Sequence, residues 1–282
     1  TVPYISLQLK AISETFEIMT HGETISNTKF FGDYTIYIAL LIAVFATFFG
    51  TQKTDASEKH KGIVASVAFE SLIKLVFFLV VGVYVTYFLF EGTEDIYTQF
   101  STTKNFQEIT TFSGFESSFD WFFTILLSFF AIFLLPRQFQ VSVVENNREK
   151  HLKKAIWLFP LYLLLFNLFV IFIAWGGMIT FGNGDNSEYF TLLLPLKEGQ
   201  FFLASLVFIG GFSAVISMIV VSTLALSTMV SNNLVIPYGF LDKFSRSKND
   251  KNALYIKGIR RVSIFVIILA SYYFYYYFSI LL

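Results

Sequence analysis

The chain has 282 residues, of which 55% are hydrophobic and 20% aromatic, whereas only 14% are charged. Soluble domains carry about 25% charged residues, so too few polar side chains remain here to cover a water-facing surface. The apolar excess and the zero net charge exclude a soluble globule, a disordered tail and a nucleic-acid binder. The absence of Cys excludes disulfide scaffolds and cysteine nucleophiles. Because the apolar residues form long blocks, the sequence predicts an all-α polytopic membrane protein embedded in a lipid bilayer.

About 20 mostly apolar residues are needed for a helix to cross the hydrocarbon core. Seven segments are predicted, at about 1–20, 34–50, 63–90, 121–144, 155–179, 201–230 and 253–282. The first contains Lys10, Glu14 and Glu17, and it resembles the outer part of a helix whose beginning is missing. The last block ends at Leu282 without a following loop. We therefore expect the chain to be a fragment of a larger membrane domain.

Positive charge alternates between successive loops. Three loops together carry 15 of the 20 Lys and Arg residues: 51–61, 137–154 and 241–261. The alternate loops carry one Lys each and 10 of the 20 acidic residues: 21–33, 91–117 and 180–200. Loops rich in Lys and Arg stay on the cytoplasmic side, so the first three are predicted to be inside and the others outside. The polar loop 91–117 is expected to hold a short external helix.

Few charged or catalytic side chains lie within the predicted spans. Catalytic motifs such as HExxH, GxSxG and the P-loop are missing, so no catalytic site is assigned. Glu70 and Lys74 lie four residues apart on the third segment, on one helical face. They indicate either a polar pathway or a structural ion pair near the cytoplasmic end. Lys10 and Glu14 form a second such pair in the reverse order.

The fourth segment is interrupted at Pro136, Arg137 and Gln138. Proline removes a backbone donor and kinks a helix, and broken helices in transporters expose backbone groups to a midplane site. The sequence leaves two interpretations open. Either the helix breaks and continues through Val144, or the span ends at Pro136.

The sixth segment is rich in hydroxyl side chains and small residues between Gly210 and Ser231. Ser213, Ser217 and Thr228 share one helical face. Hydroxyl oxygens suit a hard cation, so this face is a candidate Na⁺ site. The alternative is close helix packing, with each hydroxyl bonded to a carbonyl of its own helix.

Several of these motifs resemble the sodium:solute symporter family. The stretch from Ser213 to Leu234, beginning SAVISM, resembles the cation-site helix of that family, which reads AAVMST. The Lys53-Thr54-Asp55 loop resembles the family's Trp-Thr-Asp loop. The break at 135–138 lies where the proline symporters have Gly-Gln-Pro-His.

Five further motifs resemble one branch, the symporter-like membrane domain of hybrid sensor histidine kinases: PYISLQLKAI, FGTQKTDASEKHKG, FESLIKL, LPRQFQVSVVEN and ALSTMVSNNLVIP. The resemblance implies a LeuT-type inverted repeat with a site at the bilayer midplane. This chain would hold three helices of the first half and four of the second. The upstream helices and a downstream kinase domain would lie outside it.

The resemblance also implies the site residues. Ala214 and Ser217 match the family's cation site, but Met218 stands where the family has Thr. A thioether is a poor ligand for Na⁺, so proton coupling and sensing without coupling stay open. Substrate contacts would fall near Pro136, Arg137 and Gln138, and Arg137 suits a carboxylate.

The implied function is solute binding and transport in the bacterial cytoplasmic (inner) membrane, coupled to a sensor histidine kinase in the same polypeptide. The solute would be an amino acid or a small carboxylate. The alternative is a stand-alone symporter driven by Na⁺ or H⁺. No organic cofactor is expected, and Na⁺ is the candidate bound ion.

Overall fold

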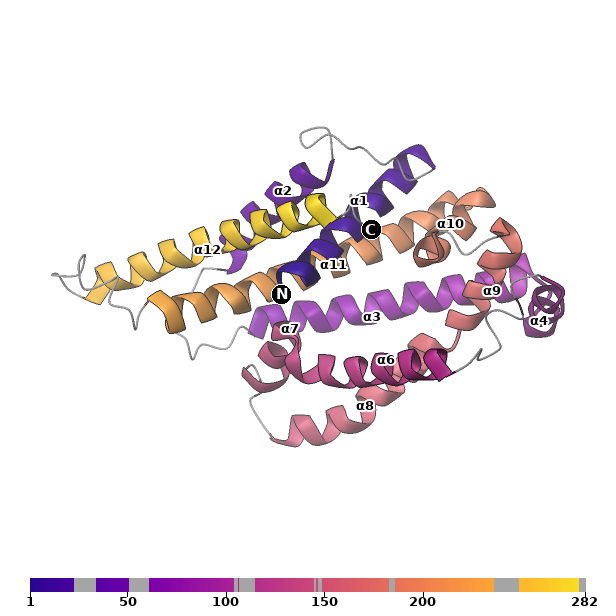
Figure 1. Ribbon diagram of the computed structural model, residues 1–282, viewed down its shortest axis with the longest axis horizontal. Helices are drawn as coiled ribbons and strands as arrows, with labels where there is room; N and C mark the ends of the chain where they lie inside the picture. Colours follow the sequence, from indigo (N-terminus) through magenta and orange to yellow (C-terminus); the bar gives the residue numbers. More distant parts are fainter. Residues whose placement is uncertain are drawn as a thin grey trace.

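The computed structural model describes residues 1–22, 34–50, 61–103, 106, 115–144, 146, 149–182, 186–235 and 249–278. All regular elements within these ranges are helical, which confirms the predicted all-α class. Two long helices, α3 (Lys61–Tyr84) and α11 (Phe201–Met229), run antiparallel along the middle of the molecule (Figure 1). The remaining helices pack on either side of this pair.

One apolar core lies between α11 and three further helices: α1 (Val2–His21), α2 (Tyr34–Gly50) and α12 (Asn249–Phe278). Its fully buried members include Ile5, Ile42, Ile219 and Ile264, one from each helix. The polar side chains of Ser13 and Thr35 are also buried here, and Thr35 Oγ1 donates a 2.7 Å hydrogen bond to Ser13 Oγ. This bond joins α1 to the first turn of α2.

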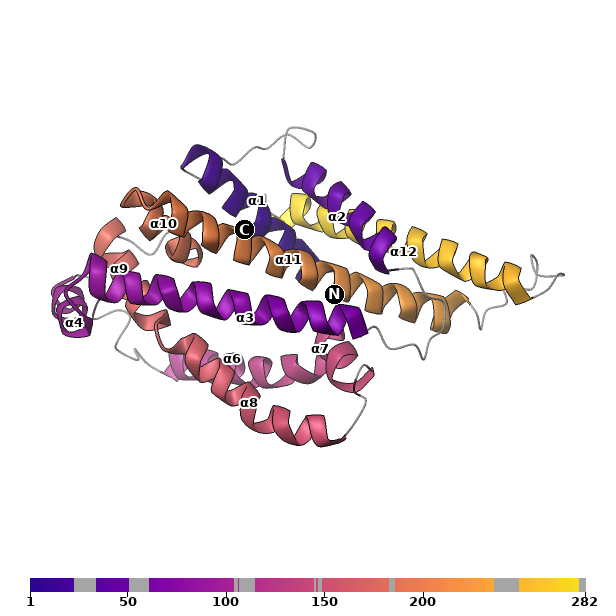
Figure 2. The same cartoon turned by 180° about the vertical axis from the view of Figure 1, so that it is seen from behind.

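A second core lies at one end of α3, where the helix widens into a π-helical turn, η1 (Val85–Leu89). It packs against three helices, which Figure 2 shows around the end of α3: α4 (Thr93–Ser101), α9 (Val170–Phe181) and α10 (Phe190–Lys197). The helix α4 occupies the 91–117 loop, as predicted. By contrast, α10 and the 3₁₀ turn η3 (Ser187–Tyr189) were not expected between residues 180 and 200.

Two predicted spans are divided. The fourth consists of α6 (Phe115–Leu134), α7 (Pro136–Phe139) and the π-helical η2 (Gln140–Val144), so the helix breaks and then continues. The fifth consists of α8 (Glu149–Asn167) and α9, separated at Leu168 and Phe169. This second break was not predicted from the sequence, although Asn167 stands directly before it in an otherwise apolar stretch.

Within the residues that the structure describes, four helical stretches are long and apolar enough to cross a membrane: Val64–Leu89, Lys150–Phe181, Phe201–Val235 and Ile256–Phe278. The apolar stretches of α2 and α6, Tyr34–Phe48 and Ser118–Ala131, are shorter. On α6 and α8 many large apolar side chains are exposed, among them Leu127 and Trp157. These features support a polytopic membrane protein whose apolar surface faces lipid.

A close contact between α9 and α3 lies at the break in the fifth span. Phe169 lies against Gly82 of α3 so closely that a Cβ atom added to Gly82 would be 2.3 Å from the Phe169 Cγ. The ring of Phe169 therefore fills the space that the missing side chain of Gly82 leaves on α3.

We predict that Gly82→Ala will destabilise the protein by about 1–3 kcal/mol, because the added methyl group overpacks this contact. Gly62→Ala on the same helix is the matched control, because nothing lies within 4 Å of a Cβ at that exposed position. The control should be neutral, or stabilising by up to about 1 kcal/mol from helix propensity. The measurement is the thermal unfolding midpoint of each variant in detergent. Equal midpoints for the two variants would contradict the close contact between Phe169 and Gly82.

Candidate functional site

Facing residues recur at intervals of seven along the interface between α3 and α11. A Cβ on Gly210 would be 2.9 Å from the ring of Phe77, so these two residues are in contact. Seven residues after Phe77 on α3 and seven residues before Gly210 on α11, Tyr84 and Leu203 line the same groove. Seven residues make about two helical turns, or about 10 Å, so the two antiparallel helices stay in step between these layers.

Continued by one more heptad, the same register predicts that Glu70 lies opposite Ser217. Glu70 precedes Phe77 by seven residues and Ser217 follows Gly210 by seven, so we infer that they lie at about the same height along the two helices. Glu70 is only 8% exposed, and Ser217 is half-buried. A carboxylate and a hydroxyl thus form a polar layer in an otherwise apolar interface.

Lys74 occupies the neighbouring turn of α3 and reaches towards α8. Its Nζ atom lies 5.7 Å from the centre of the Phe166 ring, a cation–π distance. The same ring stacks on Phe78 at 4.4 Å between centroids, and the Tyr162 hydroxyl donates a 3.3 Å hydrogen bond to the Ser71 carbonyl. Lys74 is therefore placed at the edge of the interface beside an aromatic cluster.

The three predicted cation-site residues occupy different environments on α11. Ala214 is 4% exposed and lies one turn from Gly210 on the side that faces α3. Ser217 lies in the polar layer. Met218 is half-buried and rotated about 100° from Ser217 around the helix axis, so it lies beside the polar layer rather than at its centre.

Further along α11 the hydroxyl groups mostly bond to their own helix. Thr223 donates to the Ile219 carbonyl at 2.8 Å, and Thr228 donates to the Leu224 carbonyl at 2.6 Å. The packing interpretation therefore holds for these residues. Ser222 Oγ and Ser231 Oγ differ, since both are buried and neither has a hydrogen-bond partner among the described residues.

The predicted substrate residues lie at the break after α6. Gln138 is exposed, and its carbonyl accepts a 2.6 Å hydrogen bond from the Ser142 hydroxyl. The side chains of Pro136 and Arg137 lie outside the described residues. The short helix α7 packs against α11, so the fold brings the helix break and the predicted cation-site helix together.

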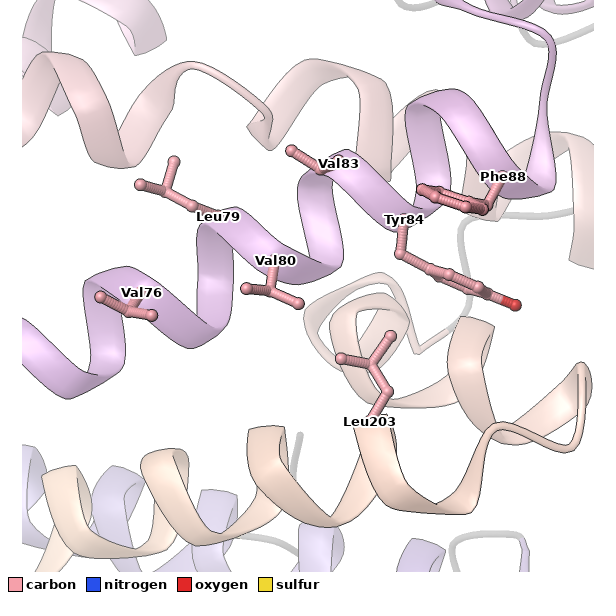
Figure 3. A pocket seen from close by; sticks show the side chains of 7 residues that line it. All are labelled: Val76, Leu79, Val80, Val83, Tyr84, Phe88 and Leu203. Atoms are coloured by element: carbon pink, nitrogen blue, oxygen red, sulfur yellow. The ribbon is translucent and has the colours of Figure 1, made fainter.

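An apolar groove continues the α3–α11 interface away from the polar layer (Figure 3). Its cavity volume is about 440 Å³, and Leu203 of α11 faces a wall formed by α3 and η1. The lining residues are Val76, Leu79, Val80, Val83, Tyr84, Phe88 and Leu203. Tyr84 supplies the one side-chain oxygen of this lining, so the groove suits hydrocarbon rather than a charged ligand.

Among the described residues, no group of three or more His, Cys, Asp or Glu side chains could hold a metal ion. An alkali cation is bound differently, by hydroxyl and carbonyl oxygens together with a carboxylate. The Glu70–Ser217 layer supplies two of these oxygen types, so it is the best candidate for such an ion.

Comparison with known proteins finds one informative relative. The chain is 29% identical over 199 residues to the uncharacterized symporter YhjB of Bacillus subtilis (strain 168). The matched region covers 70% of this chain and 37% of YhjB. No family model matches the chain, and no solved structure matches it. The chain therefore has distant similarity to a protein named as a symporter, and it spans little more than a third of that protein's length.

The register can be tested by cross-linking, because the chain has no native Cys. We predict that Glu70→Cys with Ser217→Cys will be joined by a short bifunctional thiol reagent. Tyr84→Cys with Leu203→Cys is the positive reference, and Glu70→Cys with Ile209→Cys is the negative control, because Ile209 is exposed on another side of α11. Cross-linking of the control pair in place of the Ser217 pair would contradict the polar layer.

Proposed function

We propose that this chain is part of a cation-coupled symporter that carries a small organic solute across the bacterial cytoplasmic membrane. The observation that carries the proposal is the Glu70–Ser217 layer, because a buried carboxylate in a membrane-spanning interface is costly unless it serves binding or pairing. The similarity to YhjB, whose name includes the word symporter, supports the same function.

The coupling ion would bind between the Ser217 hydroxyl and the Glu70 carboxylate, close to the backbone near Ala214. A carboxylate can take either Na⁺ or a proton. Met218 offers a thioether where the family has an oxygen ligand, and this weakens the case for Na⁺. Na⁺ is still the ion that the motif resemblance implies, and the proton is the alternative.

The solute would bind near the break between α6 and α7. The break divides the fourth span at Leu135, and α7, which follows it, packs against α11, the helix of the proposed cation site. An arginine at position 137 suits an amino acid or a small carboxylate. The proposed solute is therefore a small carboxylate-bearing molecule.

The motif resemblance also suggests a second role, in which the same domain passes solute binding to a sensor histidine kinase. Binding would then shift a population between two conformations without requiring net flux. The similarity to a protein named as a symporter favours transport as the primary function.

We predict that Ser217→Leu will lower solute uptake at least about tenfold, equal to about 1.4 kcal/mol, because the bulky side chain fills the polar layer. Ser128→Leu is the matched control, because Ser128 is exposed on α6, outside the candidate cation site. Uptake of labelled proline and histidine into vesicles, with Na⁺ or K⁺ outside and with or without a pH gradient, is the measurement. Equal loss in both variants would reject a specific role for Ser217.

We further predict that Met218→Thr will increase the ratio of uptake in Na⁺ to uptake in K⁺, because the new hydroxyl adds a hard oxygen beside Ser217. Met218→Leu is the apolar control and should leave that ratio unchanged. If Met218→Thr leaves the ratio at the level of the unaltered protein, this part of α11 does not bind Na⁺.

A further inference from the structure

The buried face of α11 changes from apolar to polar towards the end of the helix. Ile219 belongs to the first core, and Thr223, Ser227 and Ser231 follow it at four-residue intervals. All four residues are at most 1% exposed. Ser231 lies in η4 (Val230–Val235), a π-helical turn that continues α11. Because residues four positions apart share one helical face, the apolar face of α11 ends in three hydroxyl groups.

The buried face of α12 changes in the same way. Ile268 and Ile264 belong to the first core, and Arg260 is the next residue at the same interval towards the start of α12. The arginine is only 4% exposed. Since α11 and α12 run antiparallel (Figure 1), Arg260 and the three hydroxyl groups lie at the same end of the bundle. The Lys- and Arg-rich loop 241–261 predicts that this end, called the inner end below, is cytoplasmic.

Ser231 connects the two polar faces. η4 packs against α12, and Ser231 is its one buried residue among those described. The Thr223 and Ser227 hydroxyls donate to the carbonyls of Ile219 and Leu224 at 2.8 and 2.9 Å. By contrast, the Ser231 hydroxyl has no hydrogen-bond partner among the described residues. A buried hydroxyl without a partner is costly, so Ser231 offers a donor to a bound ligand.

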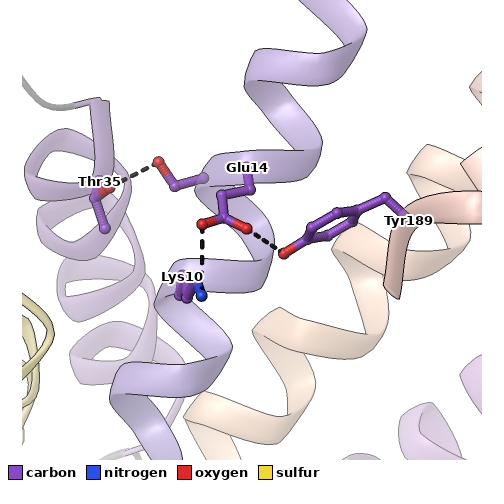
Figure 4. A network of polar contacts seen from close by, with 5 residues as sticks. Lys10, Glu14, Thr35 and Tyr189 are labelled. Carbon is purple, nitrogen blue, oxygen red and sulfur yellow. Dashed lines mark hydrogen bonds and ion pairs between the residues drawn. The ribbon is translucent and has the colours of Figure 1, made fainter. Parts of the chain in front are cut away.

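The charges of the neighbouring helices favour an anion as that ligand. α1, α2, α11 and η4 all pack against α12, and the last three contain no acidic residue in their sequences. The two acidic residues of α1, Glu14 and Glu17, lie in its outer half. Figure 4 shows Glu14 accepting the Tyr189 hydrogen bond and lying 3.8 Å from Lys10, so the pair predicted from the sequence is formed. The inner end therefore combines a guanidinium with hydroxyl donors, which attract an anion and repel a cation.

The placement of Arg260 favours a small oxyanion from water over a lipid headgroup. Arg260 faces the bundle, whereas Arg261 and Val262, the next two residues, are exposed. A lipid would therefore meet Arg261 before it met Arg260. The planar guanidinium matches two oxygens of a carboxylate or a phosphate, and the Ser231 hydroxyl can donate one further hydrogen bond.

We propose that α12 and η4 form an oxyanion-binding site at the inner end, in which Arg260 and Ser231 bind a carboxylate or inorganic phosphate. The site is separate from the proposed cation layer, because Ser231 lies 14 residues after Ser217, about 20 Å along the helix. Its existence does not rest on the proposed function. If the transported solute bears a carboxylate, this site is where that group would be held on the way to the cytoplasm.

The test measures the binding of radiolabelled inorganic phosphate and acetate to the purified protein in a nonionic detergent, at constant pH and Na⁺, with chloride as the remaining anion. We expect saturable binding of at least one of the two anions. Arg260→Gln should weaken it at least about tenfold and Ser231→Ala about three- to tenfold, the effects of losing a charged and a neutral hydrogen bond.

Two variants are matched controls, and both should leave the affinity unchanged. Arg261→Gln removes the same charge from the exposed neighbour of Arg260. Ser205→Ala removes a hydroxyl near the other end of α11, where Ser205 donates to the Phe201 carbonyl. If Arg260→Gln does not fold, Arg260→Lys replaces it, because it keeps the charge but loses the planar fork. Arg260→Lys should still weaken binding several-fold.

Four outcomes would overturn the site. They are the absence of saturable binding, an equal loss in Arg261→Gln, an unchanged affinity in Ser231→Ala, and an unchanged affinity in the Arg260 variant. Repeating the measurement in lipid nanodiscs with and without phosphatidylglycerol separates the sources of the anion. Competition by that lipid would place a lipid phosphate in the site and overturn the aqueous source. Binding is measured without uptake, so failure of the proposed transport function would leave these results standing.

Discussion

The close packing of α3 against α11 is the constraint on which the rest of the structure depends. Gly210 allows the Phe77 ring to approach the α11 backbone, and this contact fixes the register of two antiparallel helices. The same register then places an apolar layer at Tyr84 and Leu203 and a polar layer at Glu70 and Ser217. One contact between a small residue and a ring therefore sets where polarity occurs along the interface.

α11 also belongs to both apolar cores, since Ile219 packs with α1, α2 and α12, while Leu203 packs with α3 and α10. A helix shared in this way joins the two groups of helices. A charge at the bilayer centre costs about 2.5–3.5 kcal/mol on insertion scales. If the proposed cation binds at Glu70, it would favour the arrangement of α3 and α11 to which it binds more tightly.

The segment Ser187–Lys197, formed by η3 and α10, covers the other end of the same interface. Its apolar side chains pack on α3 and α11, whereas the Tyr189 hydroxyl donates a hydrogen bond to Glu14 of α1. Apolar packing is non-directional, but a hydrogen bond requires a defined distance and angle. The packing therefore keeps the segment on the interface, and the hydrogen bonds of Tyr189 and Lys197 fix its orientation.

The sequence by itself determined the helical class and located the 34–50 helix, because apolar block length acts locally. It marked Pro136 as the point where the fourth helix either breaks or ends, and the structure decided for a break followed by α7 and η2. The sequence also determined the Lys10–Glu14 pair, whose four-residue spacing needs only a helix. Only the tertiary structure decided the register that places Glu70 opposite Ser217, the contact of Phe169 with Gly82, and the hydrogen bond from Tyr189 to Glu14. The seven-residue spacings of the first pair were present in the chain, but periodicity shows which side of a helix is buried and not which helix covers it. Partners far apart in sequence are chosen by the shape of the packed helices, and a single chain carries no local record of that choice.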